Sequence, residues 1–329
     1  MTPAGDVSVG DVSVVIACHS MDRWSHTIAA IDSALGQQPR PRHVIVVVDN
    51  NIELYDRLLT ESRDMIVLHN TGERGASATR NLGVEYAVTS LVAFLDDDAV
   101  ARPGWLLRLI APFVDPSVIG TGGGIAPAWE GTVPAWFPSE FGWAVGASYR
   151  GMPRTPQRVR NVWSGNMAVR RAAFDTVAGF RRGFGKVGNT SRPEDTDFCI
   201  RVTTAVGGSW MYVPDAWVDH RVPQERGTFR FFVRRCYAEG RGKIAMSRLL
   251  GSDGSLGTEG DYLRRTLPSG VRRGLSIAVR RGELIGVARA GAIVVGAGAS
   301  AVGAGRELLT GGVAGPSRDR LRPHGEAAA

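Results

Sequence analysis

The feature that most constrains the fold is a series of short apolar runs in the first hundred residues, separated by segments with helical spacing. The runs lack the alternation of a strand with one face in water, so both of their faces are expected to be buried. They are residues 12–17, 43–48, 66–68 and 91–95, with helical segments at 22–35 and 75–87. Buried strands that alternate with helices are typical of an α/β fold, here a Rossmann-like, mostly parallel sheet with helices on both faces.

Acidic residues follow two of these runs directly. Asp49 ends the second run, and Asp96, Asp97 and Asp98 end the fourth. Ligands bind such sheets at the carboxyl ends of the strands. Asp96 and Asp98 share a face of an extended backbone and could hold one divalent cation against a phosphate. Alone, the triplet could be a solvated turn, but its position after a buried strand favours a Mg²⁺ or Mn²⁺ site that stabilises a departing diphosphate.

The charge of the chain is concentrated in its last third. Residues 226–329 contain 18 Lys and Arg against 8 Asp and Glu, whereas residues 1–225 contain 21 against 24. Because aromatic and aliphatic residues are interspersed with the basic residues of 228–250, an anionic membrane surface is the expected partner, rather than nucleic acid.

Cysteine content and the N-terminus bear on the compartment. The three cysteines, Cys18, Cys199 and Cys236, are far apart and form no CxxC pair, so neither a disulfide framework nor a zinc site is indicated. Residues 1–11 carry neither a basic region nor an apolar core of a signal peptide. We therefore expect a cytoplasmic protein, peripheral on the inner face of the cell membrane.

The chain divides into four expected parts. They are a disordered N-terminus (1–11), a catalytic domain (12–250), a basic, small-residue-rich helical extension (251–315) and a disordered tail (316–329). Arg289 interrupts the Ala-, Gly- and Val-rich segment 284–305, which leaves 16 uncharged residues, 290–305. Since a span needs roughly 20 apolar residues, a re-entrant, interfacial or packed helix is favoured over a clean span.

Six motifs in order resemble those of the family 2 glycosyltransferases. Their order carries the resemblance, since each motif alone is weak, and it covers roughly residues 12–245. They are Val14-Val15-Ile16-Ala17-Cys18-His19-Ser20, Val44 to Asn51, Gly75 to Gly83, Phe94 to Asp98, Trp163 to Ala168, and Glu194 to Phe198. The resemblance implies a GT-A fold with an Asp-x-Asp metal motif.

The resemblance also implies roles for individual residues. Asp98 and His220 would ligate the metal. A lone His is more often structural, so the ligand role of His220 depends on the family match. The residues implied in nucleotide-sugar binding are Ala17, Asp49, Arg80, Asn81, Asp96, Asp97 and Asn166. For Arg80 the alternative is a salt bridge on a helix surface.

Glu194 and Asp195 form the second predicted site. An inverting transferase needs one carboxylate to take the proton of the acceptor hydroxyl, and the resemblance assigns this role to Asp195, with Glu194 orienting it or touching the acceptor. Acids also favour a helix start, where they meet the positive end of the helix dipole. The two interpretations are compatible, because a helix terminus is a stiff platform for a base.

The family pattern departs in one place. Processive members carry Gln-x-x-Arg-Trp after the base, whereas residues 232–237 read Phe-Val-Arg-Arg-Cys-Tyr. The sequence therefore predicts transfer of a single sugar, with UDP-sugar as the default donor and a polyprenyl-linked or envelope glycan as acceptor. Arg234, Arg235, Arg241 and Lys243 are candidates for lipid phosphates, or form an ordinary solvated face. The alternatives are an inactive nucleotide-sugar-binding or scaffold protein and a nucleotidyltransferase, although 17–20 is no Gly-rich phosphate loop.

Overall fold

The computed structural model describes residues 11–187, 190–192, 194–250 and 260–310. Apart from Asp11, the two segments expected to be disordered, 1–11 and 316–329, lie outside the described residues, and so do 251–259 of the predicted extension.

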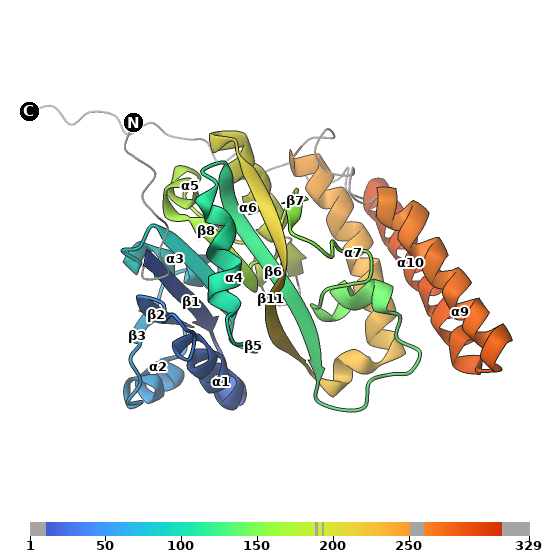
Figure 1. The fold of residues 1–329 in the computed structure, drawn as a ribbon, viewed down its shortest axis with the longest axis horizontal. Helices are drawn as coiled ribbons and strands as arrows, with labels where there is room; N and C mark the ends of the chain where they lie inside the picture. Colours follow the sequence, from blue (N-terminus) through green and yellow to red (C-terminus); the bar gives the residue numbers. More distant parts are fainter. Residues whose placement is uncertain (1–10, 188–189, 193, 251–259, 311–329) are drawn as a thin grey trace, which may run out of the picture.

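The fold is α/β, as predicted, with a nine-stranded sheet at its centre (Figure 1). The strand order is β3-β2-β1-β4-β8-β6-β11-β5, with β7 paired to β11. The strands are β1 Val12–Cys18, β2 His43–Asp49, β3 Ile66–Asn70, β4 Leu91–Asp96, β5 Ala99–Ala101, β6 Val118–Trp129, β7 Gln157–Val159, β8 Asn166–Arg170 and β11 Ser209–Val222. A separate ribbon pairs β9 Gly185–Val187 with β10 Thr190–Arg192.

The four apolar runs of the sequence are β1 to β4, and they pair in parallel. Beyond β4 the sheet becomes mixed, because β8 runs antiparallel to both β4 and β6, while β6 and β11 are parallel. Periodicity does not reveal strand direction, so this half of the sheet could not be predicted from the apolar pattern.

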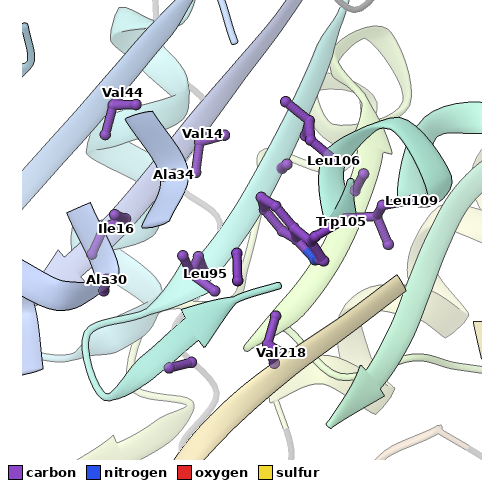
Figure 2. Close-up of a cluster of buried hydrophobic side chains, with 14 of the residues drawn as sticks. Val14, Ile16, Ala30, Ala34, Val44, Leu95, Trp105, Leu106, Leu109 and Val218 are labelled. Carbon is purple, nitrogen blue, oxygen red and sulfur yellow. The ribbon is translucent and has the colours of Figure 1, made fainter. Parts of the chain in front are cut away.

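Helices cover both faces of the sheet. They are α1 Trp24–Leu35, α2 Ile52–Leu59, α3 Ala76–Tyr86, α4 Trp105–Ile110, α5 Arg171–Thr176, α6 Glu194–Val206, α7 Phe229–Leu250, α9 Leu267–Arg281 and α10 Leu284–Thr310. Successive side chains of β1 point to opposite faces. Val14 and Ile16 join the cluster under α1 and α4 (Figure 2), and Val15 joins the cluster under α3, α5 and α6.

The register brings the predicted site to one edge of the sheet. Ala17, near the end of β1, pairs with Val47 on β2 and with Asp96 on β4. Asp49 and Asp96 are each the last residue of their strand. The carboxyl ends of three neighbouring parallel strands therefore meet where the sequence places the donor.

The C-terminal helices lie at the end of the molecule farthest from β3, with α10 between α7 and α9 (Figure 1). The segment 284–305 is thus part of a single helix, α10, that packs within its own chain. By length and composition alone, α10 is also the one helix of the described residues apolar enough to cross a membrane.

Two of the three tryptophans in the segment 120–160 attach it to the C-terminal helices. Trp136 stacks edge-on against Phe229 and Phe232 of α7. The indole N–H of Trp143 donates to the Tyr262 hydroxyl at 3.0 Å, and Trp129 packs on Phe137 in the same loop. Of the two roles open to such residues, lining a cleft or anchoring a loop, these contacts favour the second.

Candidate active site

The three carboxylates at the end of β4 have different partners. Asp96 Oδ1 lies 2.7 Å from Arg80 Nη2. Asp97 and Asp98 share Arg23, whose Nη1 is 2.9 Å from Asp97 Oδ1 and 3.0 Å from Asp98 Oδ2. The predicted Asp-x-Asp pair therefore separates into an arginine-bound Asp96 and an Asp98 whose second oxygen points elsewhere.

That second oxygen meets the predicted histidine. Asp98 Oδ1 is 3.5 Å from His220 Nε2. Strand pairing fixes the approach, since His220 on β11 lies opposite Ala99 of β5, and the Arg221 amide donates to the Asp98 carbonyl at 2.8 Å. Burial lowers the pKa of His220, although the nearby Asp98 opposes it, and a neutral imidazole can ligate a metal.

The residues present fit a divalent cation. Asp98 offers a carboxylate oxygen and His220 an imidazole nitrogen, both buried and brought together from different strands. Oxygen with imidazole nitrogen suits Mn²⁺ better than Mg²⁺, which prefers oxygen alone. In the described part of the chain no third His, Cys, Asp or Glu completes a metal cluster with them.

Asp97 is turned into the protein. It is only 5% exposed, and one of its oxygens, Oδ2, is buried without a hydrogen-bond partner in the described residues. Burial raises the pKa of Asp97 to about 7, against the opposing effect of Arg23. Arg23 ends the short 3-10 helix η2 (Met21–Arg23) that follows β1, and the sequence pattern did not single it out.

Arg80 links the end of β4 to the predicted base. It is 7% exposed, and its Nη1 lies 3.5 Å from Glu194 Oε1, while Nη2 holds Asp96. Burial lowers the pKa of Arg80, but the charges of Asp96, Glu194 and Asp195 outweigh it and the net shift is upward, so the guanidinium stays charged. Because Arg80 is buried, its ion pairs do not form a salt bridge on the surface of the helix, which was the alternative interpretation of this residue.

Asp195 and Glu194 open α6, as predicted. Asp195 accepts hydrogen bonds from the hydroxyl and the backbone N–H of Ser164, and its Oδ1 is buried without a hydrogen-bond partner among the described residues. Burial raises the pKa of both carboxyls, that of Glu194 to about 7. Asp195 thus has one oxygen held by Ser164 and one buried oxygen without a partner in the described part of the chain, and its role as general base stays a prediction.

A single turn joins the two halves of the site. Ser164 bonds Asp195, and the next residue, Gly165, packs against Asp96 so closely that a Cβ there would lie 2.4 Å from Asp96 Oδ2. A side chain at this position would displace the Asp96 carboxylate. The turn before β8 therefore sets the position of the base relative to the carboxylates of β4.

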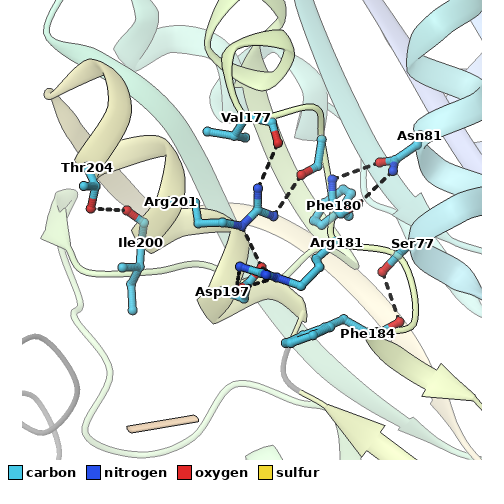
Figure 3. Close-up of polar contacts among 11 residues, drawn as sticks. Ser77, Asn81, Val177, Phe180, Arg181, Phe184, Asp197, Ile200, Arg201 and Thr204 are labelled. Atoms are coloured by element: carbon cyan, nitrogen blue, oxygen red, sulfur yellow. Dashed lines mark hydrogen bonds and ion pairs between the residues drawn. The ribbon is translucent and has the colours of Figure 1, made fainter. Parts of the chain in front are cut away.

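Two predicted nucleotide ligands have structural bonds. The Asn81 amide donates to the Phe180 carbonyl at 2.8 Å and accepts from the Phe180 N–H at 2.9 Å. Both polar ends are thus used within the protein, and Asn81 is 8% exposed. In this structure the amide ties α3 to the turn after α5 (Figure 3), and the nucleotide role of Asn81 stays an untested prediction.

Asn166 also has its polar atoms bonded within the protein, and its nucleotide role likewise stays an untested prediction. Its side chain is 1% exposed and accepts from the Trp105 indole at 2.7 Å. Its amide nitrogen donates to the carbonyls of Gly124 and Ala216, each at 2.9 Å. Asn166 therefore joins β8, β6, β11 and α4.

Asp49 keeps its place at the donor edge but already has partners. Its Oδ1 accepts from the side chains of Asn50 and Asn70, and its Oδ2 accepts from the Gly75 N–H at 2.9 Å. These bonds order the loop that leads into α3 and Arg80. Asp49 remains half-buried, with its nucleotide role still a prediction.

Asp197 anchors α6, although the sequence reasoning did not single it out. It is 1% exposed and pairs with Arg181 at 3.2 Å and with Arg201 at 2.8 Å (Figure 3). Arg201 in turn donates to the carbonyls of Val177 and Gly179. The spacing of four residues between Asp197 and Arg201 on one helix was the sequence signal that could have predicted this ion pair.

Arg226 is a further residue that the sequence reasoning missed. It lies in the 3-10 helix η5 (Gln224–Gly227), shortly after His220, and is half-buried. Burial lowers its pKa, and the charges acting on it include Asp98 and Arg23. Among the described residues no side-chain hydrogen bond or ion pair of its guanidinium is found, and the charge of Asp98 acts on it.

Comparison with known proteins places this site in a family. A family model described as Glycosyl transferase family 2 matches residues 13–178. The chain is 33% identical over 243 residues to the glucosyl-dolichyl phosphate glucuronosyltransferase of Haloferax volcanii, which covers 72% of this chain and 78% of that protein.

Solved structures agree on the fold. The mannosyltransferase PcManGT from Pyrobaculum calidifontis, in complex with GDP-Man and Mn²⁺, matches with a TM-score of 0.56 at 17% identity, over 93% of this chain and 90% of that chain. GalNAc-T7 with UDP, GalNAc and Mn²⁺ matches with a TM-score of 0.50 at 18% identity, over 78% of this chain and about half, 55%, of that chain. The protein therefore belongs to the family 2 glycosyltransferases and has the GT-A fold.

Proposed function

We propose that this protein transfers one sugar, with inversion, from a nucleoside diphosphate sugar to a hydroxyl of a lipid-linked or envelope glycan. The observation that carries the proposal is the buried Arg80, which joins Asp96 of β4 to Glu194 beside the base. The donor edge and the base thereby form one connected site. Family membership removes the nucleotidyltransferase alternative.

On the donor side, Ala17, Asp49, Arg80 and Asp96 would receive the nucleoside and ribose, with Asp97 supporting them through Arg23. Asp98 and His220 would hold a divalent cation, which neutralises the charge of the departing diphosphate when bound. The structures of PcManGT and GalNAc-T7 contain Mn²⁺, in line with the oxygen and nitrogen donors here. Arg226 would face the same diphosphate from η5.

On the acceptor side, Asp195 Oδ1 would take the proton from the attacking hydroxyl while Ser164 holds the carboxylate in place. Its raised pKa suits a base that must accept a proton near neutral pH. Glu194 would orient the acceptor. One base and one displacement invert the anomeric centre, since no covalent intermediate is formed on the enzyme.

The acceptor is proposed from the relatives. The Haloferax volcanii protein is named for a glucosyl-dolichyl phosphate acceptor, which supports a polyprenyl-linked acceptor here. Such an acceptor resides in a membrane, so we place the protein at the cytoplasmic face, with 12–250 as the catalytic domain and the later helices as its extension. UDP is the default donor nucleotide.

Replacing Asp195 tests the assignment of the base. In Asp195→Asn the shape is kept but the proton acceptor is lost, so turnover should fall at least about 10²-fold while binding of UDP with Mn²⁺ stays within about twofold. Turnover is measured with UDP-glucuronate, UDP-glucose and GDP-mannose on a polyprenyl phosphate-linked glucose. The exposed Asp215→Asn serves as the control.

Normal turnover of Asp195→Asn would show that another group is the base. Wild-type protein that binds UDP but transfers no sugar from these donors would favour the inactive, nucleotide-sugar-binding alternative.

A further inference from the structure

The outer face of α10 is apolar along most of the helix. Leu284, Val294 and Val302 are 83%, 60% and 65% exposed, and they share one side of the helix by their spacing. Val287, Val295 and the small residues between them complete this side. Arg289 is the one charged residue among the exposed positions from 284 to 302, and its side chain donates to the Ala135 carbonyl.

The inner face of α10 is fixed to the protein along its length. A Cβ on Gly240 of α7 would lie 1.9 Å from the Ser300 carbonyl oxygen, and a Cβ on Gly303 would lie 2.1 Å from that of Tyr237, so the two backbones are in direct contact. Arg241 pairs with Glu307 at 2.8 Å near the end of the helix. These contacts hold α10 against α7 and leave only its outer face available.

The neighbouring helix α9 adds basic residues to the apolar surface. Leu275 and Val279 of α9 are 47% and 85% exposed. Arg272 is exposed and by its spacing shares their side of α9, within a segment, 260–310, that has eight arginines against three acidic residues. Arginine beside exposed aliphatic side chains complements the chemistry of an anionic lipid surface.

We propose that the outer face of α9 and α10, defined by Leu275, Val279, Leu284, Val287, Val294, Val295 and Val302, docks on an anionic bilayer with both helices lying along its surface. Crossing the bilayer would require α10 to leave α7, which breaks the backbone packing and the Arg241–Glu307 pair. The inference deepens the proposed function and rests on its lipid-linked acceptor for its purpose, but the surface itself is argued without reference to catalysis.

Vesicle sedimentation tests the docking. Full-length protein is mixed with vesicles of phosphatidylcholine alone, or with about one third phosphatidylglycerol, and the bound fraction is measured. Burying two charges in the interface is costly, so Val294→Glu/Val302→Glu should lower the partition coefficient on anionic vesicles at least about tenfold. Val114→Glu, at an equally exposed position remote from α10, should bind like the wild type.

Two results would overturn the proposal. The first is pelleting of Val294→Glu/Val302→Glu with anionic vesicles to the wild-type extent. The second is a wild-type protein that is dimeric by light scattering, ignores vesicles and becomes monomeric in this variant, because a second copy would then cover the face.

Binding of UDP with Mn²⁺ to the same variant separates the two proposals. Lost vesicle binding with intact UDP binding supports the membrane surface and leaves the donor site untouched. Wild-type protein that binds vesicles but no nucleotide would contradict the proposed function and not the docking surface.

Discussion

At the scale of the residue, the site separates its carboxylates by their surroundings. Asp98 is shared between Arg23 and His220, whereas Asp195 has one oxygen bonded to Ser164 and the other buried without a partner in the described residues. Under the proposed function these similar side chains would have different tasks, cation binding at Asp98 and proton transfer at Asp195. Arg80 links the two regions through its ion pairs with Asp96 and Glu194.

Glu194 gives the site a pH dependence. Its pKa rises from 4.5 to about 7 through burial, so activity that needs the ionised pair should decline as pH falls below about 7. A raised carboxyl pKa has the opposite effect on stability, because the folded state binds the extra proton. The stabilisation is full below about pH 4.5 and is lost as pH rises through about 7.

Glu194→Gln should remove the contribution of this carboxyl group to the pH dependence of stability. We expect the melting temperature of the variant, relative to that of the wild type, to be higher at pH 8 than at pH 5, as measured by thermal unfolding at both values. The exposed Glu85→Gln should show no such change. A difference between Glu194→Gln and wild type that is the same at both pH values would contradict the raised pKa.

At the scale of the element, buried polar side chains decide how the helices meet the sheet. Asn166 bonds three elements around β8, and Asp197 fixes α6 through two arginines. The motifs of the sequence located both segments, but a motif does not say which of its members contact a ligand and which hold the fold. Asn166 lies in a motif of the family, although its side-chain amide forms hydrogen bonds within the protein core.

Asn166→Ala should therefore act on stability. The change leaves the Trp105 indole N–H and the carbonyls of Gly124 and Ala216 buried without their partner, at about 1–3 kcal/mol for each group. We expect a loss of about 3 kcal/mol or more in the free energy of unfolding, measured by urea denaturation. Gln157→Ala on the exposed face of β7 is the control. Wild-type stability in Asn166→Ala would show that these bonds do not support the sheet.

At the scale of the whole molecule, the sequence predicted the parallel half of the sheet because its strands are continuous apolar runs. The motifs singled out Asp98 and Asp195, and the family resemblance singled out His220, which the structure places 3.5 Å from Asp98; the roles of all three stay predictions. Arg23, Ser164 and Arg226 were missed because each acts on a residue distant in the chain, and no local spacing records such a contact. The antiparallel β8 was missed for a related reason, since direction is a property of the fold.

The proposed donor edge and the proposed membrane-docking face lie in different parts of the molecule. The carboxyl ends of β1, β2 and β4 form the proposed donor edge, whereas α9 and α10 lie at the end of the molecule farthest from β3 (Figure 1). Between these two regions lies α7. It begins two residues after the helix η5, which carries Arg226, and it packs against α10. A lipid-linked acceptor and a soluble donor would thus meet the protein on different sides.

The most direct measurement of the central claim is calorimetric titration with UDP, GDP and TDP, each with and without Mn²⁺, on wild type and Asp98→Ala. We predict that one nucleotide binds in a metal-dependent manner and that the variant loses this dependence, because Asp98 and His220 are the proposed protein ligands. Absence of binding by all three nucleotides, or metal-dependent binding unchanged in Asp98→Ala, would contradict the account.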